Sequence, residues 1–593
     1  MRFLVAAGLT ALLAACAAAS IESQTAPLQP EEASGYTDKP GWATQHFAVA
    51  AAHPLATDAG YKILKAGGSA VDAAIAVQMV LGLVEPQSSG IGGGSFLLHH
   101  DGKSNITEAF DGRETAPAAA RETLFLNADG KPMAFYDGVV GGRAVGVPGT
   151  VQMLEDAHRQ HGKLPWAQLF APAIALAEQG FKISERLHDL LVSDVHLQKD
   201  PIAAAYFYDA TGQPWPVGHL LKNPELASVL KRIATDGAKA LMTGDIAQAI
   251  VDKVRQHPTN PGQLALADLA AYQAIQRQPL CHDYRAAARD YRICGMPPPS
   301  SGAVAVGQIL GLLSHTPATA MPLVNGLPDA RWLHLYTEAS RLAFADRNQY
   351  IADPDFVQAP GGSGMSLLEP RYLAERARLI SPVRMKTATA GTPGPVKTSY
   401  APMAEQPEHG TSHISIVDAY GNALAMTSTI ENAFGSRQMV QGFLLNNELT
   451  DFSFAPADAQ GQAIANRVEP GKRPRSSMAP TLVFDKTTGE LLMSGGSPGG
   501  ALIIHYVAKL LYGTLNWELD AQQAINLPNF ASLNGMTLLE HQRFPAVTLQ
   551  SLKKTGAQVR EVSLTSGLQA IQRTPSGWFG GADPRREGVV QGD

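Results

Sequence analysis

The segment Gly410-Thr411-Ser412-His413-Ile414-Ser415-Ile416-Val417-Asp418 carries the strongest structural signal in this sequence. Apolar and polar residues alternate after Thr411, which predicts a strand that begins at this threonine. A second apolar run, Ala423-Leu424-Ala425-Met426-Thr427, follows turn-forming residues, so the two runs predict a hairpin. A Gly-Thr pair at the start of a strand is common, and only the surrounding sequence can give it a chemical meaning.

Motifs rich in glycine, proline, serine and arginine accompany this hairpin along the chain. They are Ala51-Ala52-His53-Pro54-Leu55-Ala56, Gly67-Gly68-Ser69-Ala70-Val71-Asp72-Ala73-Ala74, Glu85-Pro86-Gln87-Ser88-Ser89-Gly90-Ile91-Gly92-Gly93-Gly94, Asp111-Gly112-Arg113-Glu114-Thr115-Ala116-Pro117, Pro297-Pro298-Pro299-Ser300-Ser301-Gly302, Lys472-Arg473-Pro474-Arg475-Ser476-Ser477-Met478, Gly496-Ser497-Pro498-Gly499-Gly500 and Asp583-Pro584-Arg585. In this order they resemble the motifs of the gamma-glutamyltranspeptidase family. The resemblance covers nearly everything after residue 42.

The resemblance implies an α+β fold, the four-layer αββα sandwich of N-terminal nucleophile hydrolases. It also implies that the chain cleaves itself between Gly410 and Thr411. Cleavage would leave a large subunit of residues 43–410 and a small subunit of residues 411–593. Thr411 would then be both the new N-terminus and the nucleophile.

This chemistry has a physical reason. A threonine hydroxyl is a weak nucleophile and needs a base within hydrogen-bonding reach. The free α-amine of an N-terminal threonine has a pKa of about 8 and can accept the hydroxyl proton. That base does not exist while the peptide bond before Thr411 is intact, so the precursor must be cut. Glycine at position 410 lets the backbone adopt the strained conformation that an internal acyl shift needs.

A γ-glutamyl group ends in an α-amino acid, so its site needs partners for one carboxylate and one ammonium. By resemblance, Arg113 binds the carboxylate, and Ser476 and Ser477 add hydroxyl donors there. Glu448 and Asp451 suit the ammonium. Without the resemblance, Arg113 would be interpreted as part of a surface ion pair with Asp111 or Glu114, and the two acids as residues of a solvated turn.

The resemblance assigns further roles near the nucleophile. Gly499 and Gly500 would offer backbone N–H groups to the oxyanion of the tetrahedral intermediate, and Thr429 would orient the hydroxyl of Thr411. Without the resemblance, the glycines indicate a turn and Thr429 indicates a buried strand threonine.

The sequence departs from the family at Glu431, where transpeptidases carry asparagine. Glutamate can hold the substrate ammonium but cannot donate a hydrogen bond while it is ionised. With Glu448 and Asp451 it makes three acids near one site, so at least one of them is expected to be protonated or turned away. The stretch between Asp451 and Ser476 is also shorter than the lid-bearing loop of some members, which leaves the balance between hydrolysis and transfer open.

Residues 1–16 have the pattern of a targeting signal: a short positive start, then the apolar stretch Phe3–Ala15, which is too short for a transmembrane helix. Leu13-Ala14-Ala15-Cys16 resembles a bacterial lipobox, in which the cysteine is lipidated; a secretory signal cut nearby is the alternative. By analogy, Ala17 after the cysteine predicts a periplasmic protein tethered to the outer membrane of a Gram-negative bacterium. Residues 17–42 are small, polar and proline-containing, which predicts a flexible tether.

The remaining cysteines, Cys281 and Cys294, are close in sequence, and in an oxidising periplasm they are expected to form a structural disulfide. A metal or catalytic thiol pair is the weaker interpretation, because there is no CxxC motif.

The 593 residues carry a net charge of −6 and are 45% hydrophobic, which indicates a globular protein with a substantial core. No basic run suggests nucleic-acid binding.

Periodicity predicts helices at 54–65, 70–83, 151–161, 166–179, 226–233, 303–313, 330–344, 500–513 and 519–525, and strands at 47–52, 96–100, 413–418, 423–429, 443–446, 480–485, 490–494 and the chain end. This pattern alone indicates only a mixture of helices and strands. Residues 353–409 show no clear period, which suits a segment that moves away after cleavage. The glycine-rich bend Ser88–Ser95 leads into a strand and lacks a Gly-Lys-Ser/Thr ending, which predicts close backbone packing and not a phosphate loop.

The leading interpretation is a self-processing periplasmic γ-glutamyl hydrolase or transpeptidase that cleaves glutathione-like amides through a γ-glutamyl-threonine intermediate. Its partners would be a γ-glutamyl donor and either water or an amino acid or peptide acceptor; no metal and no cofactor are implied. One alternative is an acylase for another amide, such as a glutaryl side chain of a β-lactam; the acids argue against it because a glutaryl group has no ammonium. The other is a non-catalytic lipoprotein that keeps the fold, against which the intact set of candidate catalytic residues argues.

Overall fold

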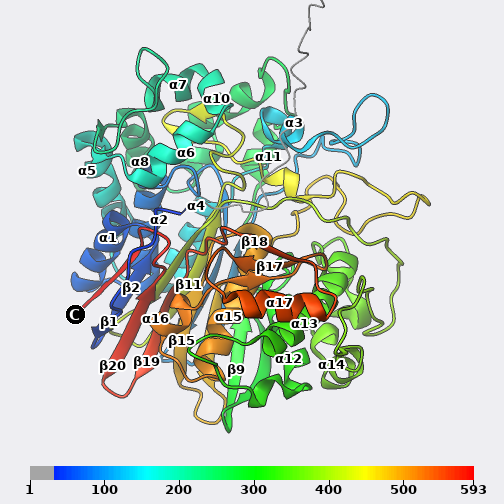
Figure 1. The fold of residues 1–593 in the computed structure, drawn as a ribbon. Helices are drawn as coiled ribbons and strands as arrows, with labels where there is room; N and C mark the ends of the chain where they lie inside the picture. The colour runs from blue at the N-terminus through cyan, green and yellow to red at the C-terminus, as the bar shows by residue number, and fades with distance from the viewer. Residues whose placement is uncertain (1–32) are drawn as a thin grey trace, which may run out of the picture.

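Two seven-stranded sheets lie face to face at the centre of the computed structural model, which describes residues 33–593 (Figure 1). The first sheet contains, in spatial order, β21 (Val589–Gly592), β2 (Ala48–Ala51), β10 (Ser412–Val417), β11 (Ala423–Thr429), β3 (Gly94–Asp101), β4 (Ile106–Gly112) and β7 (Ile275–Arg277). The second contains β1 (Trp42–Thr44), β20 (Gly577–Ala582), β19 (Gln569–Thr574), β15 (Leu491–Gly496), β14 (Thr481–Asp485), β9 (Arg289–Gly295) and β8 (Leu280–Ala286).

Along each central strand, successive side chains point to opposite faces of the sheet, so each sheet contributes side chains to the core on both of its faces. In β3, Phe96 and Leu98 are buried in the cluster that includes the second sheet, whereas Leu97 is buried with the helices that cover the first sheet. Both faces of the first sheet are therefore apolar, which explains why its middle strands are buried throughout.

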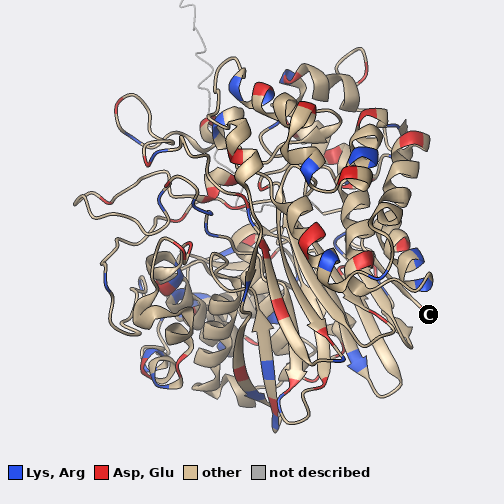
Figure 2. Ribbon diagram, turned by 180° about the vertical axis from the view of Figure 1, so that it is seen from behind, with Lys and Arg blue, Asp and Glu red and all other residues tan. Residues whose placement is uncertain are grey.

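Helices cover the outer faces of both sheets (Figure 1). The first sheet is covered by α1 (Pro54–Lys65), α2 (Ala70–Val84) and α4 (Thr150–His161), with α5 (Ala171–Gln179) packed on α2 and α8 (Pro224–Asp236) packed on α5. The second sheet is covered by α12 (Gly302–Ser314), α15 (Ile503–Leu515) and α16 (Ala521–Asn526), with α13 (Ala330–Tyr350) packed on α12. The predicted four-layer αββα sandwich is confirmed. Acidic and basic residues are interspersed over the ribbon (Figure 2).

Shorter elements complete the described part of the chain. They are α3 (Phe135–Val139), α6 (Glu185–Ser193), α7 (Pro201–Phe207), α9 (Lys239–Met242), α10 (Gly244–Arg255), α11 (Leu266–Ala271), α14 (Pro370–Ala377), α17 (Ala546–Lys554), β5 (Phe181–Lys182), β6 (Leu220–Leu221), β12 (Met439–Val440), β13 (Phe443–Leu444), β16 (Phe530–Ala531), β17 (Thr537–Glu540) and β18 (Val559–Val562).

The predicted elements agree with the structure except at a few places. The hairpin forms as β10 and β11, and the helix expected at 54–65 is α1 with the same bounds. The expectation for residues 353–409 is wrong in one respect, because α14 forms there and buries Tyr372 and Leu373 on one face. The strand expected at 443–446 contains only two residues.

The glycine-rich bend before β3 packs closely against the end of β11. A Cβ atom at Gly93 would lie 2.0 Å from the carbonyl oxygen of Thr429, so no other residue fits there without displacing β11. The backbone packing predicted for this bend is what the structure shows.

Cys281 and Cys294 lie directly opposite each other on β8 and β9 and form a disulfide, with their Cα atoms 4.0 Å apart.

Of the expected tether, residues 33–41 lie against the C-terminal part of the chain, where the N–H groups of Ser34 and Thr37 donate to carbonyl oxygens of residues 585 and 584. The expected signal segment and Cys16 lie outside the described residues. No helix among residues 33–593 is long and apolar enough to cross a membrane.

Candidate active site

Two threonine hydroxyls meet at the carbonyl oxygen of Gly410. The Thr411 hydroxyl donates to this oxygen, and the Thr429 hydroxyl donates to it at 2.8 Å. The pairing of Ser412 with Ser428 in the hairpin places the two threonines at the same end of neighbouring strands, where both are buried. The Thr411 oxygen therefore lies against the carbonyl group it must attack, and Thr429 can stabilise negative charge on the oxygen of that group.

The backbone on both sides of this contact is held in an unusual conformation. Gly410 has φ +39°, and a Cβ atom there would lie 2.2 Å from the carbonyl oxygen of Glu431. Glu431 itself has φ 72°, a region that non-glycine residues rarely adopt. Such strain persists only where the surrounding structure enforces it, and here it surrounds the bond expected to break.

A buried acid cluster surrounds Arg113. The guanidinium donates to Oε1 of Glu448 and, at 2.5 Å, to Oδ2 of Asp451, and all three side chains are almost fully buried. Burial raises the pKa of Asp451 well above its usual range, although Arg113 opposes this shift. Burial and the neighbouring Glu448 likewise raise the pKa of Glu114. Because these side chains are buried, Arg113 does not form a surface ion pair, and Glu448 and Asp451 do not lie in a solvated turn.

Glu431 joins this cluster from the end of β11. Its Oε2 accepts hydrogen bonds from the side chains of Asn447 and Thr450, and its Oε1 accepts one from the backbone N–H of His409 at 3.2 Å. Burial, followed by the charges of Asp451 and Glu448, raises the pKa of Glu431 well above its usual range. The side chain therefore favours the protonated acid, which, like asparagine, can donate a hydrogen bond.

A separate group of positive residues holds Glu408, two positions before Gly410. Its carboxylate accepts hydrogen bonds from Arg347 and from the Ser477 hydroxyl, both at 2.5 Å, and lies 3.7 Å from Arg475. Burial raises the pKa of Glu408, but Arg347 and Arg475 outweigh burial and hold it below its usual range. No role was predicted from the sequence for Glu408, Arg347 or Arg475. Of these three, only Arg475 lies in a motif named in the sequence analysis, so only this residue could have been identified from the sequence.

Ser476, expected at the substrate carboxylate, and the glycine pair expected at the oxyanion make other contacts in the uncut chain. The Ser476 hydroxyl accepts from the backbone N–H of Met478 at 3.1 Å, so Ser477 alone of the serine pair contacts the carboxylate of Glu408. Gly499 and Gly500 have φ +133° and +54°, and a Cβ at Gly500 would lie 1.9 Å from the Glu408 carbonyl oxygen. The segment before the scissile bond therefore packs directly on the expected oxyanion hole.

Comparisons with known proteins identify the family of this chain. A family model described as gamma-glutamyltranspeptidase matches residues 56–592. The glutathione hydrolase proenzyme of Bacillus subtilis (strain 168) is 36% identical over 558 residues, covering 92% of this chain and 91% of the relative. The structure of cephalosporin acylase from Bacillus halodurans matches with a TM-score of 0.80 and 25% identity, covering 96% of this chain and 99% of that one. Gamma-glutamyltranspeptidase of Helicobacter pylori matches with a TM-score of 0.52 and 31% identity, covering 63% and 97%.

The contact of Thr429 with the Gly410 carbonyl predicts a role in self-cleavage. Thr429→Val keeps the shape of the side chain but removes the hydroxyl, so cleavage should slow by about 100-fold, the effect of losing one oxyanion donor. Thr429→Ser should retain rapid cleavage, and Thr411→Ala should give none. Intact mass spectrometry over time measures the fraction cut, and cleavage of Thr429→Val at the wild-type rate would exclude the role.

The raised pKa of Glu431 predicts how the stability of the uncut chain depends on pH. Above about pH 4.5 the unfolded chain releases a proton that the folded chain still binds, so stability falls as pH rises until Glu431 ionises in the folded chain. In a Thr411→Ala background, Glu431→Gln should flatten this fall by up to about 1.4 kcal/mol per pH unit. Denaturant unfolding at several pH values measures the slope. The exposed Glu369→Gln should leave it unchanged, and an unchanged slope for Glu431→Gln as well would contradict the assignment.

Proposed function

This chain belongs to the gamma-glutamyltranspeptidase family, and from that premise we propose that it is a self-processing γ-glutamyl hydrolase and transpeptidase. Its substrates are glutathione and related γ-glutamyl compounds, and its acceptors are water or an amino acid or peptide. The family match and the glutathione hydrolase relative support the reaction type, and the charge arrangement of the site supports the substrate class.

The observation that carries the proposal is the division of the site into an acidic half and a basic half. The acidic half holds Glu114, Glu431, Glu448 and Asp451 around Arg113. The basic half holds Arg347, Arg475 and Ser477 around the carboxylate of Glu408. An α-amino acid group carries one ammonium and one carboxylate, and it fits across these two halves.

In the uncut chain, Glu408 stands where the substrate carboxylate would bind. When cleavage frees the C-terminal end of the large subunit, the Glu408 carboxylate can leave Ser477, Arg347 and Arg475, and the substrate carboxylate takes its place. The carboxylate role expected of Arg113 is then shared with Arg347 and Arg475. Arg113 also keeps Glu448 and Asp451 in position for the ammonium.

The reaction proceeds in two steps. The Thr411 hydroxyl loses its proton to its own α-amine and attacks the γ-amide carbonyl, while the N–H groups of Gly499 and Gly500, free of Glu408, stabilise the oxyanion. The C–N bond breaks, the leaving amine takes the proton, and a γ-glutamyl ester on Thr411 remains. Water or an amine then attacks the ester, which releases glutamate or a new γ-glutamyl amide and restores the hydroxyl.

An acylase is the second candidate, because the Bacillus halodurans structure with a TM-score of 0.80 is a cephalosporin acylase. A glutaryl group differs from a γ-glutamyl group only by the missing ammonium. A glutaryl substrate would bring no ammonium to the acidic half of the site, where Arg113 already pairs with Glu448 and Asp451, so the additional acids favour the γ-glutamyl group.

Three anilides separate these functions, because the second and the third each lack one charge of the acyl chain that the first carries in full. L-γ-Glutamyl-p-nitroanilide carries both charges, glutaryl-p-nitroanilide lacks the ammonium, and 4-aminobutanoyl-p-nitroanilide lacks the carboxylate. Each missing charge should lower kcat/KM by about tenfold or more, since a hydrogen bond to a charged group contributes about 1.5–3 kcal/mol. Release of p-nitroaniline is the measurement, and Thr411→Ala is the blank. A preference for the glutaryl anilide would establish the acylase instead.

We further propose that the protein is a lipoprotein of the periplasm, tethered to the outer membrane through Cys16. The lipobox-like sequence Leu13-Ala14-Ala15-Cys16 supports this location. Cells that express the full chain and are fed radiolabelled palmitate should produce a labelled protein, and Cys16→Ser should abolish the label. Labelling of Cys16→Ser, or an unlabelled wild-type protein in the soluble periplasmic fraction, would contradict the anchor.

A further inference from the structure

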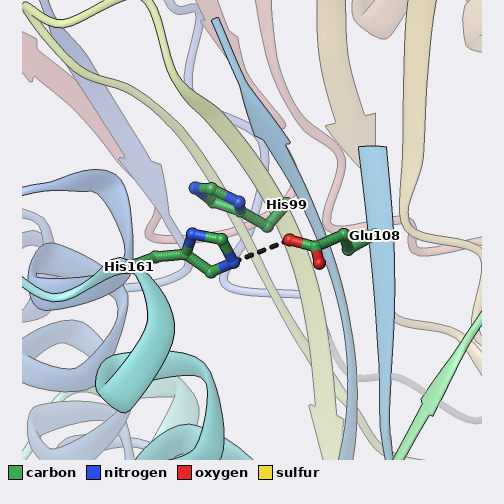
Figure 3. Close-up of side chains that lie close together, drawn as sticks. All are labelled: His99, Glu108 and His161. Carbon is green, nitrogen blue, oxygen red and sulfur yellow. Dashed lines mark ion pairs between the residues drawn. The ribbon is translucent and has the colours of Figure 1, made fainter. Parts of the chain in front are cut away.

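Three side chains with metal-binding atoms meet on the outer face of the first sheet (Figure 3). His99 of β3 and Glu108 of β4 are direct partners in the antiparallel ladder, so both side chains project from the same face. His161 is the last residue of α4 and reaches back to this pair. Residues far apart in sequence thus converge where a helix ends over two strands.

The imidazole of His99 is buried without a hydrogen-bond partner. The residue is 1% exposed, and neither ring nitrogen makes a hydrogen bond among the described residues. The ring of His161 stacks on it, with 3.9 Å between the ring centroids. A buried polar group without a partner is costly, and it indicates a ligand that completes its bonding.

The other two residues are already arranged as ligands. Nε2 of His161 lies 2.7 Å from Oε2 of Glu108, and the remaining oxygen of Glu108 accepts a hydrogen bond from the Gln276 amide at 2.5 Å. Such a bond to the second carboxylate oxygen is the support that metal-binding carboxylates usually have. Both side chains are partly exposed, so solvent and an ion have access.

We propose that His99, Glu108 and His161 form a zinc site, with water as the fourth ligand. One potential ligand atom from each residue lies within 4.8 Å of the others. Tetrahedral zinc with bonds of about 2.1 Å requires ligand atoms about 3.4 Å apart. The wider separations would therefore close by at most about 1.4 Å, and the 2.7 Å separation of His161 and Glu108 would open by about 0.7 Å. Two imidazoles and one carboxylate suit zinc, whereas Mg²⁺ and Ca²⁺ prefer sites made of oxygen atoms.

This site is distinct from the Thr411 site. Gly94 pairs with Thr429 and Leu424 pairs with His99, so the metal position lies five residues further along β3, about 17 Å at about 3.4 Å per residue. The zinc would join the C-terminus of α4 to β3 and β4. The N-terminus of the same helix hydrogen-bonds through Thr150 to Gly93 and Ser95, beside the active site. The zinc would therefore stabilise the helix that borders the active site without entering the reaction.

The test uses the full, self-processed protein without a histidine tag. After removal of metals with a chelator, the protein is given Zn²⁺ and passed over a desalting column, and bound zinc is measured by elemental mass spectrometry. We expect one zinc for each large subunit, which carries all three ligands. We also expect a rise in Tm of at least about 2 °C over the chelated protein, because an ion that binds only the folded state stabilises it. Less than stoichiometric zinc with no change in Tm would overturn the proposal.

Variants locate the ion on these residues. His161→Gln and Glu108→Gln should each lose stoichiometric zinc and the rise in Tm, whereas the exposed His541→Gln should keep both. The chelated variants should match the chelated wild type in Tm, which shows that they fold. Cobalt(II) should give the visible band of a tetrahedral complex with the wild type and not with His161→Gln. Retention of one zinc by His161→Gln, or its loss by His541→Gln, would place the ion elsewhere.

Discussion

The register between β10 and β11 is the constraint on which the site depends, because it sets Thr411 beside Thr429 at one carbonyl group. A shift of one residue would turn the two side chains to opposite faces of the sheet and separate the hydroxyls. The hairpin lies in the middle of the first sheet, between β2 and β3, so both of its edges are held by other strands. The apolar layers above and below it make any other register costly. The core of the sandwich thus positions Thr411, the proposed nucleophile, against the Gly410 carbonyl in the uncut chain.

The uncut segment before Thr411 has two functions in this arrangement. It places Gly410 in a strained conformation against Glu431, and it supplies Glu408 to neutralise arginines that would otherwise be buried without a counter-ion. A buried charge that loses its partner is strongly unfavourable. Departure of this segment would therefore leave the arginines of the basic half without the carboxylate of Glu408. In the proposed function, the substrate carboxylate replaces it, which would link self-cleavage to substrate binding.

The local elements follow from local patterns, and they could be predicted. The alternation of apolar and polar residues on both sides of a turn predicts the hairpin, and the helical spacing of apolar residues after Pro54 predicts α1. Arg113, Glu448 and Asp451 were named from motifs, but their roles as surface ion pair or ligand set were undecided until burial was known. The expectation that at least one of the clustered acids is protonated or turned away agrees with the raised pKa of Glu431, whose neighbours Asp451 and His409 lie 20 and 22 residues away in the sequence.

Other features depend on contacts between distant segments and left no readable pattern. Glu408 and Arg347 are 61 residues apart, and nothing in either neighbourhood indicates that they pair. The same is true of His99 and His161, which meet because α4 ends over β3. By itself, the sequence determined the elements, the candidate nucleophile and the motif residues, since these arise from periodicity and from short runs of the chain. Only the tertiary structure decided which charges face one another and which are buried, because pKa and metal affinity depend on neighbours brought together by folding.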